Sequence, residues 1–343
     1  MNPYALFIMV SSLTIGTLTT ISSSHWFLAW IGLEINTLAI IPLMTQQLHP
    51  RATEAATKYF LTQAAASALI LFSALTSAWS TGQWEIKETL TSNMLTIALA
   101  MKLGLAPMHF WLPEVLQGLD LTTGLILSTW QKIAPMALIY LVHASLNTSL
   151  LIFMAIAPTL LGGWGGLNQT QVRKILAYSF IAHLGWMIMI MAFFTHLAML
   201  NFTIYVILTS TLFLTMKTIY TTKITSLALS WPKAPVLATI SSMTLLSLGG
   251  LPPMTGFMPK WLILQELIKQ NMTPIATIMA FSALLSLFFY LRLSYSTSLT
   301  FSSNTPSSTT TWRHMTNQTT LLQSTLVIVS MLILPITPLF LWT

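Results

Sequence analysis

The fold is decided by Leu248-Gly249-Gly250-Leu251-Pro252-Pro253, which interrupts the long apolar run 233–268. A similar cluster, Leu103-Gly104-Leu105-Ala106-Pro107, interrupts the apolar run 92–118. Proline lacks a backbone N–H and clashes with the preceding turn, so each run is expected to break into two half-helices. The residues predicted to form these breaks are Gly104, Pro107, Gly249, Gly250, Pro252 and Pro253.

The composition places most of the chain in lipid. Of the 343 residues, 55% are hydrophobic and 6% are charged, whereas a soluble domain carries about a quarter charged residues. Apolar runs such as 5–21 and 27–44 are continuous rather than alternating, so they predict helices and not the strands of a barrel. The sequence therefore predicts an all-α integral membrane protein.

The apolar runs predict about eleven transmembrane helices, because a span needs about 20 residues. The expected spans are 3–22, 25–45, 54–79, 92–118, 122–146, 148–166, 173–195, 199–221, 233–268, 273–296 and 319–341.

The two breaks suggest an internal repeat. They lie five spans apart, and in each a further proline follows six residues after Pro107 or Pro253. An odd number of helices per repeat would make the two halves inverted, as in many ion transporters. We expect a first five-helix repeat at 1–146, a second at 147–296, and a polar loop with a C-terminal transmembrane helix at 297–343. The alternative is that glycine and proline are simply common in membrane helices.

Basic residues predict the orientation. With eleven spans, nine fall on the side that holds the N-terminus and two on the other, so the N-terminus is expected on the positive side. The nine are Arg51, Lys58, Arg173, Lys174, Lys217, Lys223, Lys233, Arg292 and Arg313, and the two are Lys87 and Lys269.

Several functional classes are excluded or disfavoured. The chain has no cysteine, so it cannot hold a disulfide, a thiolate metal site or an iron–sulfur cluster. Its net charge of +7 is scattered between apolar runs, which argues against a nucleic-acid-binding face. No phosphate-binding or dinucleotide-binding motif is present, and no metal site is expected. The start of the chain is expected to be a retained span rather than a cleaved signal.

Four charged residues lie inside the predicted spans, namely Glu34, Lys102, Lys132 and Lys260. Each costs about 2.5–3.5 kcal/mol at the bilayer centre on insertion scales, so each needs a partner, internal water or a neutral form. Glu34 is the natural counter-charge for a lysine, and we predict that it pairs with Lys102. Buried lysines that gain and lose a proton are suited to proton transfer.

Histidine is a second candidate relay group. His183 lies inside the span 173–195 and is predicted to take part, although a packed histidine is an equal alternative. Lys260 could instead extend to the membrane surface, and the pair of Glu34 with Lys102 could be purely structural.

The most specific segments of the chain are Ser24–Glu34, Thr53–Gln63, Lys102–Trp111, Trp130–Lys132, Trp164–Ser179 and Leu248–Trp261. In these the sequence closely resembles the subunit 2 family of mitochondrial NADH–ubiquinone oxidoreductase, the antiporter-like membrane subunits of respiratory complex I. The resemblance covers nearly the whole chain, except the part after Ser296. It implies that Lys132 is the central lysine of the proton path and Lys260 the exit-side lysine.

The resemblance also implies the setting. It places the chain in the mitochondrial inner membrane with its N-terminus towards the matrix. It implies that the chain binds no cofactor, and that NADH, FMN, iron–sulfur clusters and ubiquinone are held elsewhere in the complex. The expected partners are other complex I membrane subunits, including antiporter-like neighbours, together with accessory subunits and lipids such as cardiolipin.

Three functional hypotheses remain. The first is a proton-translocating subunit of this NADH:ubiquinone reductase that carries no redox chemistry itself. The second is a free-standing cation/proton antiporter of the same fold. The third is a structural membrane subunit whose buried charges do not conduct.

Overall fold

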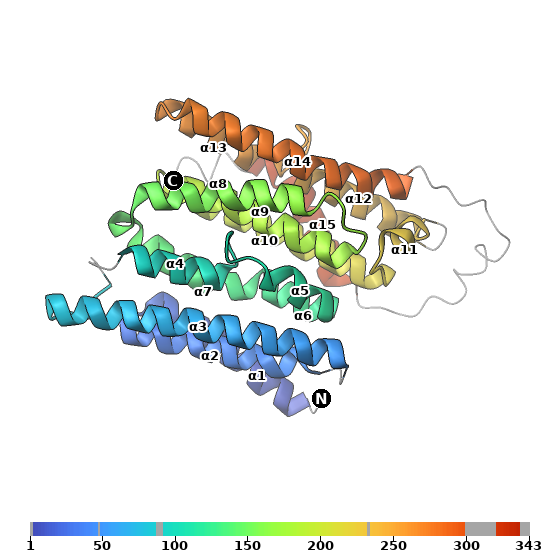
Figure 1. The fold of residues 1–343 in the computed structure, drawn as a ribbon. Helices are drawn as coiled ribbons and strands as arrows, with labels where there is room; N and C mark the ends of the chain where they lie inside the picture. Colours follow the sequence, from blue (N-terminus) through green and yellow to red (C-terminus); the bar gives the residue numbers. More distant parts are fainter. Residues whose placement is uncertain (1–2, 47–48, 87–91, 232–233, 299–319, 337–343) are drawn as a thin grey trace. The chain divides into compact units, whose positions relative to one another are not determined.

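The computed structural model describes residues 3–46, 49–86, 92–231, 234–298 and 320–336. Within these ranges all regular secondary structure is helical, which confirms the predicted class (Figure 1). The helices are α1 (Pro3–Ser22), α2 (Trp26–Met44), α3 (Pro50–Thr81), α4 (Ser92–Leu103), α5 (Trp111–Gly118), α6 (Leu121–Ser128), α7 (Trp130–Val142), η1 (His143–Ser145), α8 (Thr148–Gly165), α9 (Val172–Met191), α10 (Thr195–Ile219), α11 (Ile224–Ala228), α12 (Pro235–Gly249), α13 (Phe257–Lys269), α14 (Thr273–Ser298), α15 (Leu321–Leu332) and η3 (Leu334–Ile336).

Eight helices of the described ranges are long and apolar enough to cross a membrane, when α6, α7 and η1 are taken as one. Each agrees with a predicted span to within four residues. The predicted span 319–341 is represented by α15, of 12 residues. Most of the predicted polar loop lies outside the described residues, as do Lys87, Lys233 and Arg313.

The chain separates into two compact units. Unit 1 comprises Met1–Pro158 with Ile188–Thr195, and unit 2 comprises Thr159–Met187 with His196–Thr343. The predicted repeats 1–146 and 147–296 concern a symmetry between two parts of the chain. A division into compact units does not test that symmetry, so the repeats stay a prediction.

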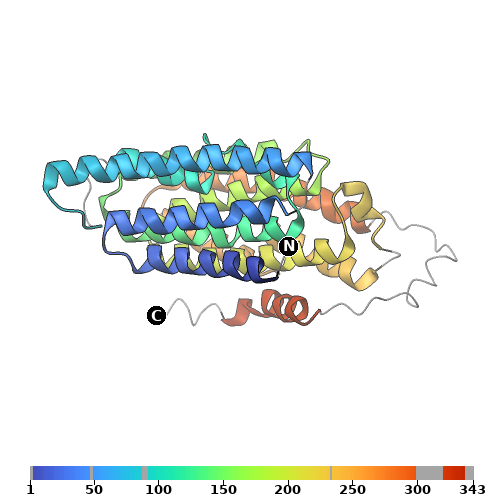
Figure 2. The same cartoon turned by 90° about the horizontal axis from the view of Figure 1, so that it is seen from below.

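In unit 1, helices α1, α2 and α3 lie side by side, as Figure 2 shows. Helices α4 and α5 pack against α3, while α7 packs against α1 and α4. This arrangement surrounds the first helix break with residues of α2, α3 and α7.

In unit 2, α14 packs against α11, α12 and α13. Ring contacts join α9 to α10, since Phe180 lies 6.0 Å from Tyr205 and 5.6 Å from Phe213 between ring centroids. The second helix break therefore lies beside α14.

Both predicted helix breaks are present, and the helix before each break ends in the same way. Helix α4 stops at Leu103 and α12 at Gly249. The next residues, Gly104 and Gly250, have φ of +74° and +83°, a left-handed conformation that glycine adopts without steric cost. The amide N–H of Leu105 then reaches back to Ala100 O at 2.9 Å, and that of Leu251 to Leu246 O at 3.4 Å. The same backbone hydrogen-bond pattern thus closes both half-helices.

The sequence did not predict the break between α6 and α7. Thr129, with φ −111° and ψ −68°, separates the two helices within the expected span 122–146. Its hydroxyl donates to Leu125 O at 2.7 Å, and this back-bonding competes with the helical ladder and bends helices. As a result Lys132 lies in the first turn of a new helix.

Candidate proton-transfer site

The three predicted lysines are buried. The exposed fraction is 4% for Lys102, 1% for Lys132 and 8% for Lys260, while Glu34 on α2 is half-buried. Lys102 is the penultimate residue of α4, and Lys260 lies in the first turn of α13. The alternative that Lys260 extends to the surface does not describe this structure.

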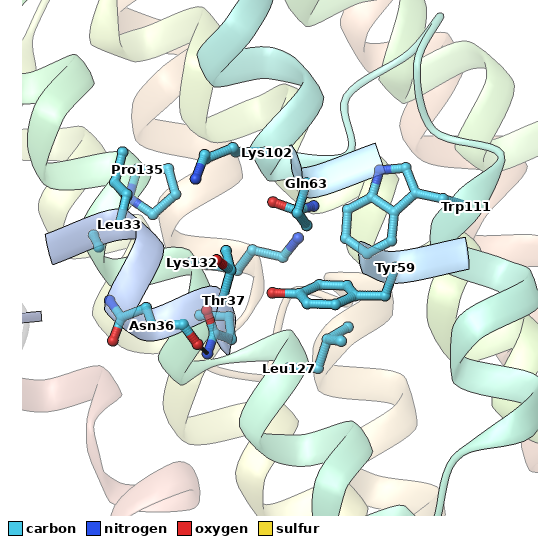
Figure 3. A pocket seen from close by; sticks show the side chains of 12 residues that line it. Leu33, Asn36, Thr37, Tyr59, Gln63, Lys102, Trp111, Leu127, Lys132 and Pro135 are labelled. Carbon is cyan, nitrogen blue, oxygen red and sulfur yellow. Dashed lines mark hydrogen bonds between the residues drawn. The ribbon is translucent and has the colours of Figure 1, made fainter. Parts of the chain in front are cut away.

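Lys102 and Lys132 line one pocket of unit 1 (Figure 3). Its volume is about 10 Å³, which is room for about one water molecule. The lining residues are Leu33, Asn36, Thr37, Tyr59, Gln63, Lys102, Trp111, Leu127, Gln131, Lys132, Ala134 and Pro135. The first break therefore lies against a small polar pocket that holds two lysine side chains.

The ammonium of Lys132 is held by the first helix break. Its Nζ donates to Leu103 O at 2.6 Å and lies 5.1 Å from the centroid of the Trp111 ring. Leu103 ends α4, where carbonyl groups have no helical partner and carry the negative end of the helix dipole. The break thus supplies both a hydrogen-bond acceptor and a partial negative charge.

Glu34 and Lys102 do not form a direct ion pair, contrary to the predicted arrangement. The Glu34 carboxylate instead accepts a hydrogen bond from the Thr37 hydroxyl at 3.0 Å, one turn along α2. Lys102 Nζ has no hydrogen-bond partner among the described residues, although it still interacts electrostatically with Glu34. A local hydroxyl satisfies the carboxylate, so the two charges interact through space.

The pocket also contains polar side chains that were not predicted from the sequence. Asn36 and Gln63 are buried, and amide atoms of both have no hydrogen-bond partner among the described residues. The hydroxyl of Tyr59 points towards Lys132 (Figure 3). Buried amides are normally hydrogen-bonded, so an amide within an apolar run indicates a polar site inside the protein. Asn36 and Gln63 were the sequence signal for this pocket.

The second break holds its lysine in the same way. Lys260 Nζ donates to Gly249 O at 2.9 Å and to Leu248 O at 3.3 Å. These carbonyls end α12, as that of Leu103 ends α4. In both units a buried lysine therefore binds the carbonyl end of an interrupted helix.

His183 lies on α9 within unit 2 and is half-buried. Its Nε2 lies 3.3 Å from the hydroxyl of Tyr290 on α14, and it interacts electrostatically with Lys260. The predicted residues thus fall into two groups. Unit 1 holds Glu34, Lys102 and Lys132, and unit 2 holds His183 and Lys260.

Two family models match consecutive parts of the chain. The model described as "NADH:quinone oxidoreductase/Mrp antiporter, TM" matches residues 23–286. The model described as "NADH dehydrogenase subunit 2 C-terminus" matches residues 287–341.

Solved structures share the fold. A chain of respiratory complex I from Thermus thermophilus has a TM-score of 0.83 and 25% identity, covering 98% of this chain and 80% of that chain. A chain of the Mrp complex from Dietzia sp. has a TM-score of 0.83 and 16% identity, covering 97% of this chain and 75% of that chain.

Curated relatives are similar to this chain over nearly the whole length of both. NADH-ubiquinone oxidoreductase chain 2 of Xenopus laevis is 63% identical over 342 residues, which cover 99% of each chain. The chain of the same name from Squalus acanthias is 60% identical over 341 residues, which cover 98% of each chain. Matched over almost its whole length, the chain belongs to the NADH–ubiquinone oxidoreductase chain 2 family.

Proposed function

We propose that the chain is a proton-translocating membrane-arm subunit of NADH:ubiquinone oxidoreductase. In this proposal Glu34, Lys102 and Lys132 hold and pass protons in unit 1, and His183 and Lys260 do so in unit 2. Electron transfer takes place in other subunits, and its free energy reaches this chain as a change in nearby charge.

The proposal includes the setting of the chain. It has eleven spans in two inverted five-helix repeats and a C-terminal helix, in the mitochondrial inner membrane with the N-terminus towards the matrix. NADH, FMN, iron–sulfur clusters and ubiquinone bind elsewhere in the complex. Antiporter-like neighbours, accessory subunits and lipids such as cardiolipin contact its surface.

The observation that carries the proposal is the matched lysine at each helix break. Lys132 donates to Leu103 O, and Lys260 donates to Gly249 O, each at the carbonyl end of a half-helix. Interrupted helices in corresponding positions are typical of transporter ion sites. A single break with a lysine could be structural packing, whereas the same arrangement in both units favours a shared function.

The contacts at the first helix break offset the cost of burying a charged Lys132. A charged lysine at the bilayer centre costs about 2.5–3.5 kcal/mol. A hydrogen bond of a charged group contributes about 1.5–3 kcal/mol, and a desolvated cation–π contact adds about 2 kcal/mol. These contacts are large enough to offset the cost, so the break can hold Lys132 as an ammonium inside the membrane.

A change in nearby charge alters the proton affinity of Lys132. A unit charge at about 10 Å acts with about 1.7 kcal/mol at an effective dielectric constant of about 20. This free energy changes the equilibrium constant for proton binding by more than tenfold. Charge rearrangement at Glu34 and Lys102 is the proposed trigger for Lys132.

The test replaces the lysines one at a time by methionine in the assembled complex. Lys132→Met and Lys260→Met are expected to lower the number of protons pumped per electron, measured in liposomes beside the NADH:ubiquinone rate. A native gel checks that the complex is assembled. The matched control is Lys269→Met, because Lys269 has a side chain 63% exposed and should leave pumping unchanged. Normal pumping in both Lys132→Met and Lys260→Met would refute the proposal and favour a structural subunit.

The same native gel separates the proposal from a free-standing antiporter. Co-migration of the chain with NADH dehydrogenase activity supports a subunit of the complex. Migration apart from that activity supports the antiporter.

A further inference from the structure

Tyr290 is a buried tyrosine that the proposed proton path does not yet use. It lies on α14 with 0% of its surface exposed. Its hydroxyl and His183 Nε2 are 3.3 Å apart, which is a long hydrogen bond. This contact joins helices separated by 107 residues along the chain.

The ring of Tyr290 also packs against the second helix break. A Cβ built on Gly249 would lie 3.6 Å from Tyr290 Cδ2 and 3.7 Å from its Cβ. The Gly249 carbonyl is the acceptor that holds Lys260 at 2.9 Å. One side chain therefore contacts both the histidine and the residue that binds the lysine.

A tyrosine hydroxyl can form a hydrogen bond with a histidine in both protonation states of the histidine. Towards neutral His183 the O–H donates to Nε2, which places the histidine proton on Nδ1. Towards protonated His183 the Nε2–H donates, and the tyrosine oxygen accepts. The Ser179 hydroxyl, which also interacts with the Tyr290 hydroxyl, can receive the displaced O–H hydrogen bond. Tyr290 thus keeps a partner for His183 in either state.

Charge repulsion between Lys260 and protonated His183 makes the contact of His183 with Tyr290 important. Lys260 acts electrostatically on His183, and two positive charges close together inside a protein oppose each other strongly. The charged side chains buried in unit 2 include no carboxylate in the described part of the chain. Protonation of one group therefore favours loss of the proton from the other.

We propose that Tyr290 is a positioning residue for His183, which fixes the ring and the tautomer of the histidine at the second helix break. Through this hydrogen bond Tyr290 sets how readily His183 exchanges its proton. The inference rests on the proposed proton-transfer function and adds a residue to it.

The test is Tyr290→Phe, which keeps the ring against Gly249 and removes only the hydroxyl. The matched control is Tyr295→Phe, which deletes the same atom from a 56% exposed tyrosine on the same helix. Each variant is made in the assembled complex, and pumping per electron is measured in liposomes as a function of pH. We expect the pH profile of Tyr290→Phe to shift by about one pH unit, a tenfold change in a proton equilibrium. The profile of Tyr295→Phe should be unchanged.

A double variant shows whether Tyr290 acts through His183. In a His183→Ala background, Tyr290→Phe should cause no further change, because coupled residues are not additive. An additive effect overturns the inference. So does an unchanged pH profile in Tyr290→Phe while Lys260→Met has lost pumping, and in that case the proposed function stands. If Lys132→Met and Lys260→Met also pump normally, the proposed function itself has failed.

Discussion

A methyl group at Gly250 should displace Lys260 from the second helix break. Gly250 has φ +83°, and an added Cβ would lie 3.0 Å from both Nζ and Cδ of Lys260. An alanine in the left-handed region costs about 1–2 kcal/mol. Loss of the hydrogen bond from a charged group to Gly249 O adds about 1.5–3 kcal/mol. Gly250→Ala should therefore destabilise unit 2 by about 2.5–5 kcal/mol.

Gly82 provides the matched control for this prediction. It follows α3 with φ +73°, and a Cβ built there would meet nothing within 4 Å. Gly82→Ala therefore carries the backbone strain alone, about 1–2 kcal/mol. The difference between the two variants isolates the displacement of Lys260.

The assay compares thermal midpoints and pumping of the two variants in the assembled complex. Gly250→Ala should melt several degrees below Gly82→Ala and should pump fewer protons per electron. In a Lys260→Ala background the extra loss at Gly250 should disappear, because the side chain that the methyl group strikes is gone. Equal midpoints for Gly82→Ala and Gly250→Ala would refute the reasoning.

Three further predictions address other contacts. Arg292 donates to Gln169 O at 2.6 Å and also to Leu167 O, so Arg292→Lys should lose this fork and lower the thermal midpoint measured by scanning calorimetry. The side chain of Lys58 is 42% exposed and pairs with Glu54 and Glu114, so Lys58→Met should leave the thermal midpoint almost unchanged at high salt in the same melts. Thr129→Val removes the hydroxyl that bonds Leu125 O, and pumping assays should show a slower rate because the start of α7 shifts.

The helix breaks could be predicted because their cause is local. Proline at 107 and at 252–253 cannot continue a helix, and a glycine just before supplies the left-handed residue. The limits of the eight long spans could be predicted for the same reason, since the thickness of the lipid core sets the length of an apolar run. The break at Thr129 was missed because threonine usually tolerates a helix, and only its back-bonding to Leu125 O reveals the bend.

The pairing of charges could not be predicted, because it depends on tertiary geometry. Glu34 satisfies its carboxylate with Thr37, which lies one turn along the same helix. Lys132 and Lys260 find backbone carbonyls rather than side chains, and a sequence does not show which carbonyls a break leaves unpaired. The contact of Tyr290 with His183 joins distant helices, so no local pattern could indicate it.

The acceptor at each break has a consequence for how a proton is handled. A carboxylate opposite a lysine would neutralise its charge, but it could also take the proton and keep it. The carbonyls of Leu103 and Gly249 are peptide groups, which do not become protonated at physiological pH. They act as fixed dipoles that stabilise the ammonium and never compete for its proton. The proton on Lys132 or Lys260 can then leave only towards water or another titrating group, because the acceptor at the break cannot take it.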